Sequence, residues 1–459
     1  MSANRSLALG GALALCTAAG AQAPATDAVV EKLLDEAAAV SPELGEARAS
    51  IEADRARVPQ VEALPDPVLS LGIQNDGFTR IAIGAAETSW VSIMLTQPLP
   101  WPGKRALREQ VAELDVRAAR ARQQRALLQL DARVRRAYLD LLLARGQLDL
   151  LAELEALWAG AERLARARYE AGRVPQSDLL RAQLELARLG QRRWALEAAI
   201  ASRLAEVNRL RARPLDEEVA TRTRLFDVAD PAIPPAEQAQ ADAESRSPEL
   251  LLARLAVEQW GRRVELARKE TRPDFAVSAG VMPRGLLEPM WTVGFSIGLP
   301  LWTARKQGQA VTESEQRGIA QAQGAEAVRQ ILRLRTHERL QALKALARTN
   351  RRFRDGLLVL SQATARSALA QYEVGQLPFA SVLDALSGSV ADRGSYLASI
   401  ADAQRLAIAQ REVSLEATPA PSVGLPGGSM PGGGGVANRP GPASAPGTAA
   451  ENSSRMGGM

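Results

Sequence analysis

Two long stretches without proline constrain the fold of this chain more than any other feature of its sequence. Residues 103–174 and residues 301–377 contain no proline, and alanine, leucine, arginine, glutamate and glutamine dominate both. At 1.5 Å of rise per residue, each stretch could extend roughly 100 Å as one helix. Hydrophobic residues make up 46% of the chain but aromatic residues only 4%, which favours closely packed helices over a large globular core.

A heptad pattern in the first stretch predicts coiled-coil packing. The a positions are Leu127, Val134, Leu141 and Leu148, and the d positions are Leu130, Ala137, Ala144 and Leu151. We expect the two long helices to end at Gly172 and Gly375, and the next helices to start after Pro175 and Pro378. Glycine beyond a helix and proline at the next first turn predict two helical hairpins.

The sequence repeats itself at an offset of about 205 residues. The matching segments are SPEL at 41–44 and 247–250, PD at 65–66 and 273–274, LP at 99–100 and 299–300, and YEAG at 169–172 with YEVG at 372–375. Their order and spacing agree along the chain. Two copies of one structural unit therefore occupy residues of about 41–213 and 247–416.

Each copy also contains two segments in which apolar residues alternate with small or polar ones. These segments are residues 68–74, 91–96, 275–281 and 291–299. The alternation predicts four β-strands, each with one apolar face. A single such hairpin would fit a soluble sandwich as well as a membrane β-barrel. Four strands cannot close into a barrel, and lipid does not tolerate open edges, so a barrel would need strands from several chains.

The first 21 residues have the pattern of a secretory signal peptide. Arg5 precedes an apolar stretch at residues 6–19 that is too short to span a bilayer, and we expect cleavage after Ala21. Lipidation of Cys16 is the alternative, although Leu15 stands where a small residue is preferred.

The composition changes near residue 417. Residues 417–459 are rich in glycine, proline, alanine and serine and have no periodic apolar residues. This predicts a disordered tail, because such a segment cannot bury a core. The mature protomer is therefore expected to comprise residues 22–416.

The composition offers little for catalysis or for binding a metal. One cysteine and one histidine, His337, exclude a disulfide framework, a Cys/His zinc site and most histidine-based catalysis. We therefore expect no enzymatic activity, no cofactor and no metal site. The net charge of +5 arises from 57 basic and 52 acidic residues interspersed along the chain, so no nucleic-acid partner is expected.

Taken in order and found twice, these features resemble the TolC family of outer-membrane efflux proteins over nearly all of residues 41–416. The segments RYEAGRVPQSDLL at 168–180 and YEVGQLPFASVLDA at 372–385 match the family's helical turns. The resemblance implies a mainly α-helical protein with a membrane β-barrel part. It implies a homotrimer with a twelve-stranded barrel in the outer membrane of a Gram-negative bacterium and a coiled-coil tunnel in the periplasm.

The resemblance also implies a function and partners. The chain would be the exit duct of a tripartite efflux system, docked to a periplasmic adaptor (membrane fusion) protein and an inner-membrane transporter of the RND type. The passage QPLPWPGKR at 97–105 is similar to the heavy-metal branch, the CusC and CzcC type, which implies metal cations as substrates. A soluble periplasmic coiled-coil adaptor or scaffold is the alternative function.

Four residues match positions of the family's pore gate. The acid matching Asp384 belongs to the constriction ring, the residues matching Tyr372 and Asp178 belong to the contacts that hold it closed, and Ser381 replaces a second ring acid. We expect the Tyr372 hydroxyl to donate a hydrogen bond to Asp178 across the two hairpins. Judged on their position alone, both aspartates are acids in the first turns of helices, where the helix dipole stabilises them.

Overall fold

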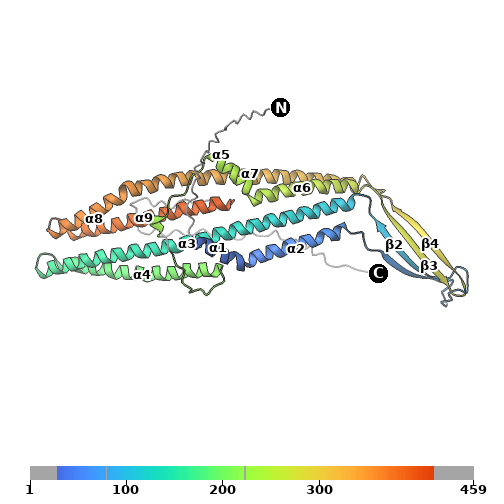
Figure 1. The fold of residues 1–459 in the computed structure, drawn as a ribbon, viewed down its shortest axis with the longest axis horizontal. Helices are drawn as coiled ribbons and strands as arrows, with labels where there is room; N and C mark the ends of the chain where they lie inside the picture. Colours follow the sequence, from blue (N-terminus) through green and yellow to red (C-terminus); the bar gives the residue numbers. More distant parts are fainter. Residues whose placement is uncertain (1–27, 79, 222–223, 418–459) are drawn as a thin grey trace, which may run out of the picture. The chain divides into compact units, whose positions relative to one another are not determined.

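The computed structural model describes residues 28–417, apart from residues 79 and 222–223, and shows one order of elements twice (Figure 1). The first series is α2 (Pro42–Glu62), β1 (Val68–Gln74), β2 (Trp90–Leu99), α3 (Lys104–Glu170) and α4 (Gln176–Leu210). The second is α6 (Pro248–Lys269), β3 (Asp274–Arg284), β4 (Leu287–Gly298), α7 (Gln307–Arg352), α8 (Leu358–Glu373) and α9 (Phe379–Glu412). The predicted signal peptide, the alternative lipidation of Cys16 and the predicted tail from residue 418 onward lie outside the described residues.

Shorter helices precede each series. They are α1 (Ala28–Val40), the 3-10 turn η1 (Leu225–Asp227) and α5 (Ala236–Arg246). Equivalent serines then cap α2 and α6: Ser41 accepts the amide of Leu44 at 3.4 Å, and Ser247 accepts the amide of Leu250 at 3.2 Å. A proline follows each serine at the first helical position, where its missing N–H costs nothing.

The first proline-free stretch forms α3, one unbroken helix of 67 residues. All four predicted d positions are buried, and so are Val134 and Leu141 at a positions. The other two a positions depart from the pattern: Leu148 is half-buried, and Leu127 is 44% exposed in the single chain. The predicted seam thus packs along most, but not all, of its length.

The second proline-free stretch is not one regular helix. A π-helical turn, η2 (Phe353–Leu357), separates α7 from α8. The turn is held from two sides: Arg354 and Asn350 bind the Asp230 carboxylate at 2.8 and 2.7 Å, and the Phe353 ring packs on Tyr396 at 5.7 Å. These contacts stabilise a local widening that the proline-free sequence did not predict.

The helices of the two series pack against each other. α3 contacts α2 and α4 of its own series, and α6 and α9 of the other. α9 in turn packs on α7 and α8. Within the described residues, no helix combines the length and the apolar character needed to cross a bilayer.

The four strands form one antiparallel sheet in the order β1-β2-β3-β4. The two series meet at the centre of the sheet, where β2 pairs with β3 and Leu99 lies opposite Phe275. β1 and β4 are therefore edge strands. With seven residues, β1 is shorter than the roughly 9–11 residues typical of a membrane-spanning strand.

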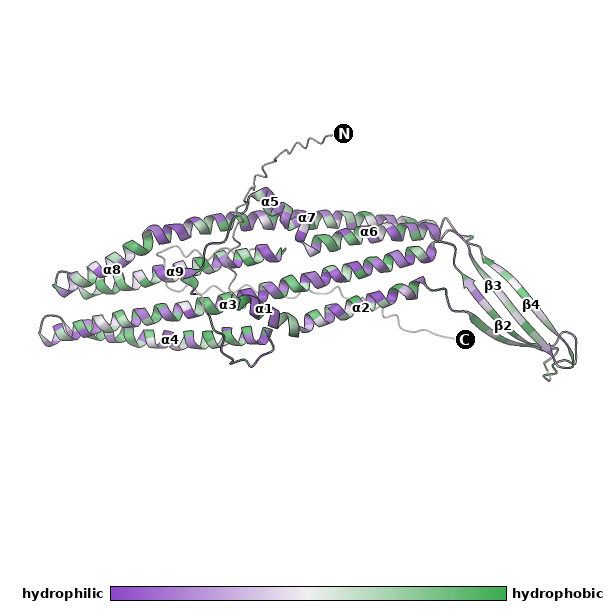
Figure 2. Cartoon of the chain, viewed as in Figure 1, coloured by the Kyte–Doolittle hydropathy of each residue, from purple (hydrophilic) through white to green (hydrophobic). Residues whose placement is uncertain are grey.

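One face of the sheet carries exposed apolar side chains across all four strands. Leu71, Ile93, Val281 and Trp291 lie opposite one another in register and are exposed. Figure 2 shows hydrophobic colour along much of the strands, whereas hydrophilic and hydrophobic residues alternate along the helices. A continuous apolar face of this kind is unusual for a surface in contact with water.

Candidate functional site

The two helical turns have the same backbone geometry. Gly172 and Gly375 adopt left-handed conformations with φ of 72° and 81°, just beyond α3 and α8. The amides of Arg173 and Gln376 reach back to the carbonyl groups of Arg168 and Gln371 at 2.8 and 2.9 Å. Such bonds satisfy carbonyl groups that the helix ends would otherwise leave without partners.

Proline begins the return arm of each hairpin. Pro175 and Pro378 hold the N-cap positions of α4 and α9 in an extended conformation. Their carbonyl groups accept the amides of Asp178 and Ser381 at 3.2 and 3.1 Å. Asp178 and Ser381 therefore lie at equivalent places in the first turns of the two return helices. The expectation that Asp384 is also a first-turn acid is wrong, because α9 begins at Phe379 and Asp384 lies beyond its first turn.

Tyr372 lies at the contact between the two hairpins. Its side chain is 2% exposed and packs against the Phe379 ring, with centroids 5.3 Å apart, while Trp158 meets Phe379 edge-on at 6.5 Å. Arg168, at the end of α3, covers the Tyr372 ring at 4.7 Å and also donates to the Tyr372 carbonyl oxygen. The two turns are thus joined by a cation–π contact and a charge-assisted hydrogen bond.

The prediction that the Tyr372 hydroxyl donates a hydrogen bond to Asp178 is wrong. The Tyr372 hydroxyl is buried and has no hydrogen-bond partner among the described residues. Burial raises the pKa of Tyr372, the negative charge of Asp178 raises it further, and Arg168 partly offsets both. Asp178 is therefore close enough to act through its charge, but the polar contact with Tyr372 is made by Arg168.

Asp384 is exposed in the single chain, and Ser381, half-buried, lies one helical turn before it on α9. No ion pair involving Asp384 is formed within the part of the chain that the structure describes. The structure thus brings Tyr372 and Asp178 together and leaves Asp384 free to face another molecule.

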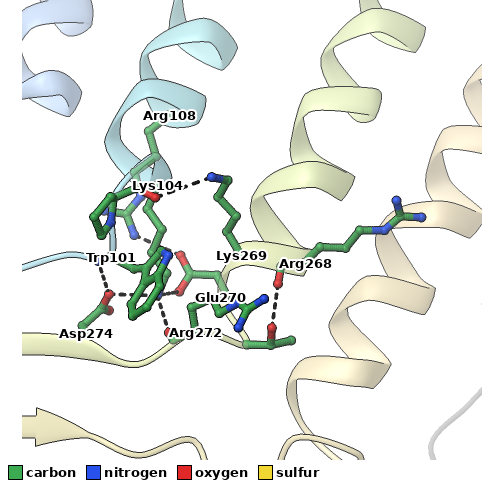
Figure 3. Close-up of polar contacts among 10 residues, drawn as sticks. Trp101, Lys104, Arg108, Arg268, Lys269, Glu270, Arg272 and Asp274 are labelled. Carbon is green, nitrogen blue, oxygen red and sulfur yellow. Dashed lines mark hydrogen bonds and ion pairs between the residues drawn. The ribbon is translucent and has the colours of Figure 1, made fainter.

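A second cluster lies where β2 leads into α3, in the passage at residues 97–105 (Figure 3). Lys104 is 1% exposed, and its ammonium group donates to Asp274 at 2.9 Å and to the Arg272 carbonyl oxygen at 3.1 Å. It also pairs with Glu270 at 3.0 Å. All three partners belong to the second series, so this one lysine joins the two copies at the base of the sheet.

Neighbouring groups fix the position of Lys104. The Trp101 amide donates to Asp274 at 2.7 Å, and the Trp101 ring packs on Phe275 with centroids 5.5 Å apart. Gly103 has φ of 87°, and a Cβ atom there would lie 2.5 Å from the ammonium nitrogen of Lys269. Glycine is therefore needed for the backbone conformation, whereas the end of the flexible Lys269 side chain could move aside.

Sequence reasoning missed Arg168 and the partners of Lys104. Arg168 stands in the quoted turn segment, and a cation in the last turn of a helix is a general stabilising feature that points to no particular partner. Glu270 and Asp274 are more than 160 positions from Lys104 in the sequence, so no local pattern links them. Within the described ranges, no group of three or more His, Cys, Asp or Glu side chains is arranged to hold a metal ion.

Residues 33–213 match the model of the outer membrane efflux protein family. Over 277 residues the chain is 25% identical to the nickel-cobalt-cadmium resistance protein NccC of Alcaligenes xylosoxydans xylosoxydans. The chain is thus similar to this family over the first of its two internal repeats. The alignment with NccC covers 60% of this chain and 62% of the length of NccC.

Solved structures of two membrane channels have the same fold. CusC superposes with a TM-score of 0.68 at 16% identity, covering 84% of this chain and 92% of CusC. The outer membrane channel CmeC of Campylobacter jejuni gives a TM-score of 0.68 at 13% identity, covering 90% of this chain and 94% of CmeC. The predicted fold, long helical hairpins with four strands per chain, is confirmed.

Proposed function

We propose that this chain is the outer-membrane exit duct of a tripartite efflux system, with its helical part in the periplasm. The observation that carries the proposal is the four-stranded sheet, which exposes a continuous apolar face and has two unpaired edges. An apolar outer face suits contact with lipid, and an unpaired edge in lipid needs a further strand. A soluble adaptor, the alternative function, has no need for either property.

The assembly we propose is a homotrimer. Three chains with four strands each supply enough strands to close a barrel, for which eight is about the practical minimum. Each chain also contributes two helical hairpins, which together would continue the barrel as a tunnel. The match of residues 33–213 to the outer membrane efflux protein family supports docking of this tunnel to a periplasmic adaptor and an inner-membrane transporter, which we propose is of the RND type.

As substrates we propose heavy-metal cations. The support comes from the similarity to NccC, a nickel-cobalt-cadmium resistance protein, and from the passage at residues 97–105. A wide tunnel lined by polar side chains has no filter that strips hydration shells. We therefore assign the choice of substrate to the partner pump and a purely conducting, non-enzymatic role to this chain.

Gene deletion tests the function and the substrate class together. We expect the deletion strain to become more sensitive to nickel, cobalt, cadmium, copper and zinc, and a plasmid copy to restore resistance. Dyes and detergents serve as the comparison panel. Sensitivity to organic compounds alone would overturn the metal assignment and retain the duct, whereas recovery of the mature protein without detergent would overturn the duct and favour the soluble adaptor.

A further inference from the structure

The junction around Lys104 has the form of an interface between two structural copies. On one side, β2 leads into α3 and supplies Lys104; on the other, α6 leads into β3 and supplies Glu270 and Asp274 (Figure 3). Arg108 adds a second cation to Glu270 at 3.1 Å. One copy therefore presents basic side chains after a strand, and the other presents two acids before or at the start of a strand.

The two edges of the sheet carry similar acidic and basic side chains, but within one chain these do not contact each other. Glu62 and Asp66 precede β1 and stand 208 positions before Glu270 and Asp274 (270 − 62 and 274 − 66). Arg305 and Lys306 follow β4, as Lys104 follows β2. All four outer side chains are exposed, and none has an ion-pair partner in the ranges that the structure covers.

Apolar side chains show the same arrangement. At the inner junction Trp101 packs on Phe275 and is half-buried. At the outer edges Pro67, the equivalent of Phe275, is exposed beside the acids, and Trp302 is 71% exposed beside the bases. Two exposed patches that each resemble one side of a buried contact are complementary to each other in polarity and in charge.

We infer that a second copy of this chain completes the contact, with Arg305 and Lys306 of one copy paired to Glu62 and Asp66 of the next. The inference rests on the proposed function, because it requires chains that share one sheet. β4 of one copy then pairs with β1 of the next, and the ion cluster closes the base of that seam. The contact between two chains would then have the same form as the junction between the two repeats within one chain.

The internal pairing predicts the register of the seam. Leu99 lies opposite Phe275, and the equivalent residues are Leu299 of one copy and Pro67 of the next. Continuing along the strands gives three opposed pairs, written with the β4 residue first: Ile297 with Leu69, Phe295 with Leu71, and Val293 with Ile73. All six side chains are apolar and exposed in the single chain.

The other face of the strands agrees with this register. The same shift places Ser296 opposite Ser70 and Gly294 opposite Gly72. A slip of one residue would instead oppose Phe295 to Ser70 or to Gly72 and would break the apolar face. The register was obtained from the inner pairing alone, so the match of polarity on both faces is independent support.

Disulfide formation tests the register. Directly opposed residues on antiparallel strands have Cα atoms about 4.5–5.5 Å apart, within reach of a disulfide. We expect the double variant Leu71→Cys with Phe295→Cys to form disulfide-linked oligomers in isolated membranes. Ser70→Cys with Phe295→Cys is the control for a one-residue slip, and the single-cysteine variants control for Cys16. Linkage through Ser70→Cys in place of Leu71→Cys would overturn the register.

Charge reversal tests the ion cluster. We expect Asp66→Lys and Lys306→Asp each to lower the temperature at which the detergent-solubilised oligomer dissociates, and the combined variant to regain most of the loss. Glu46→Lys, on an exposed site of α2 without an ion pair in the described structure, is the matched control and should leave that temperature unchanged. If the dissociation temperature of the combined variant fell by the sum of the two single shifts, with no recovery, the ion cluster would be overturned.

The two tests separate failure of this inference from failure of the proposed function. If the cysteine variants cross-link but charge reversal gives no rescue, the ion cluster is overturned and the shared sheet is retained. A wild-type chain that forms no oligomer and no cross-link in membranes would remove the shared sheet, and the proposed duct with it.

Discussion

The two strand-to-helix junctions of this chain are built from similar side chains but differ in burial. Lys104 in the first is almost fully buried and binds three oxygen acceptors, whereas Arg305 and Lys306 in the second are exposed. Trp101 packs on a neighbouring ring, but Trp302 is 71% exposed. The difference indicates that duplication gave the chain one complete interface inside and two matching halves at its edges.

The largest effect is expected from breaking the inner junction. Lys104→Met keeps an unbranched side chain, one atom shorter, but leaves Asp274 without its ion-pair partner and Glu270 with Arg108 alone. We expect a loss of about 3 kcal/mol in the free energy of unfolding, near the lower limit for a buried pair, because both carboxylates remain partly exposed. The urea midpoint of the dissociated, detergent-solubilised chain measures this loss.

The matched control for that variant is Lys306→Met at the outer junction. In a dissociated chain, the exposed Lys306 has no partner among the described residues, so its loss should shift the unfolding midpoint of the monomer little. Equal shifts for the two lysines would contradict the distinction between a complete and an incomplete junction.

The two helical turns offer a second comparison between the repeats. They differ in that Arg168 of the first turn binds Tyr372 of the second. Arg168→Ala removes the cation from the Tyr372 ring and the bond to its carbonyl oxygen, together worth about 1–2 kcal/mol. If these contacts hold the tunnel closed, we expect the open fraction in planar-bilayer recordings to rise roughly tenfold. Arg173→Ala, an exposed arginine in the same turn, should leave it unchanged.

A smaller change, in selectivity rather than in gating, is expected at Asp384. Three copies around one axis would bring three carboxylates to one narrow opening, which attracts cations. Asp384→Ala should therefore reduce cation selectivity and weaken block by multivalent cations in bilayer recordings. Asp392→Ala, two turns further along α9, is the control. Unaltered conductance, selectivity and block in Asp384→Ala would leave this acid a helix-turn residue only.

The smallest expected effect is a shift in the titration of Tyr372. Burial and the charge of Asp178 raise its pKa above the ordinary value of 10.0, so the folded state favours the neutral phenol. The stability that this gives is present below pH 10 and is lost as the pH rises through the higher folded value. The absorbance titration of wild type minus Tyr372→Phe should therefore have a midpoint above pH 10, and a midpoint at or below 10 would contradict the buried position.

Local patterns carried much of the fold. Alternation placed strands such as β1, and the glycine-proline pairs placed both helical turns, because strand period and turn geometry depend on near neighbours. The pairing of β2 with β3 and the Lys104 cluster were not predictable, since the residues involved lie far apart in the sequence. The π-helical turn at Phe353 was not predictable either, because the residues that hold it, Asp230 and Tyr396, come from other segments.

Residue roles at the turns were harder to predict than the turns themselves. The resemblance pointed to Tyr372 and Asp178 as partners, but the choice between a hydrogen bond and a cation–π contact depends on side-chain packing across two hairpins. Arg168 makes the polar contact with Tyr372, because its guanidinium group can bind the Tyr372 carbonyl oxygen and cover the ring at the same time. A sequence motif records neither contact.

The central claim is that several copies of this chain share one membrane-embedded sheet. The most direct test is the mass of the native complex, extracted from the outer membrane in mild detergent and measured with the bound detergent subtracted. We predict a complex of three processed chains. A monodisperse monomer under the same conditions would contradict the claim, because β1 and β4 would then remain as open edges in lipid.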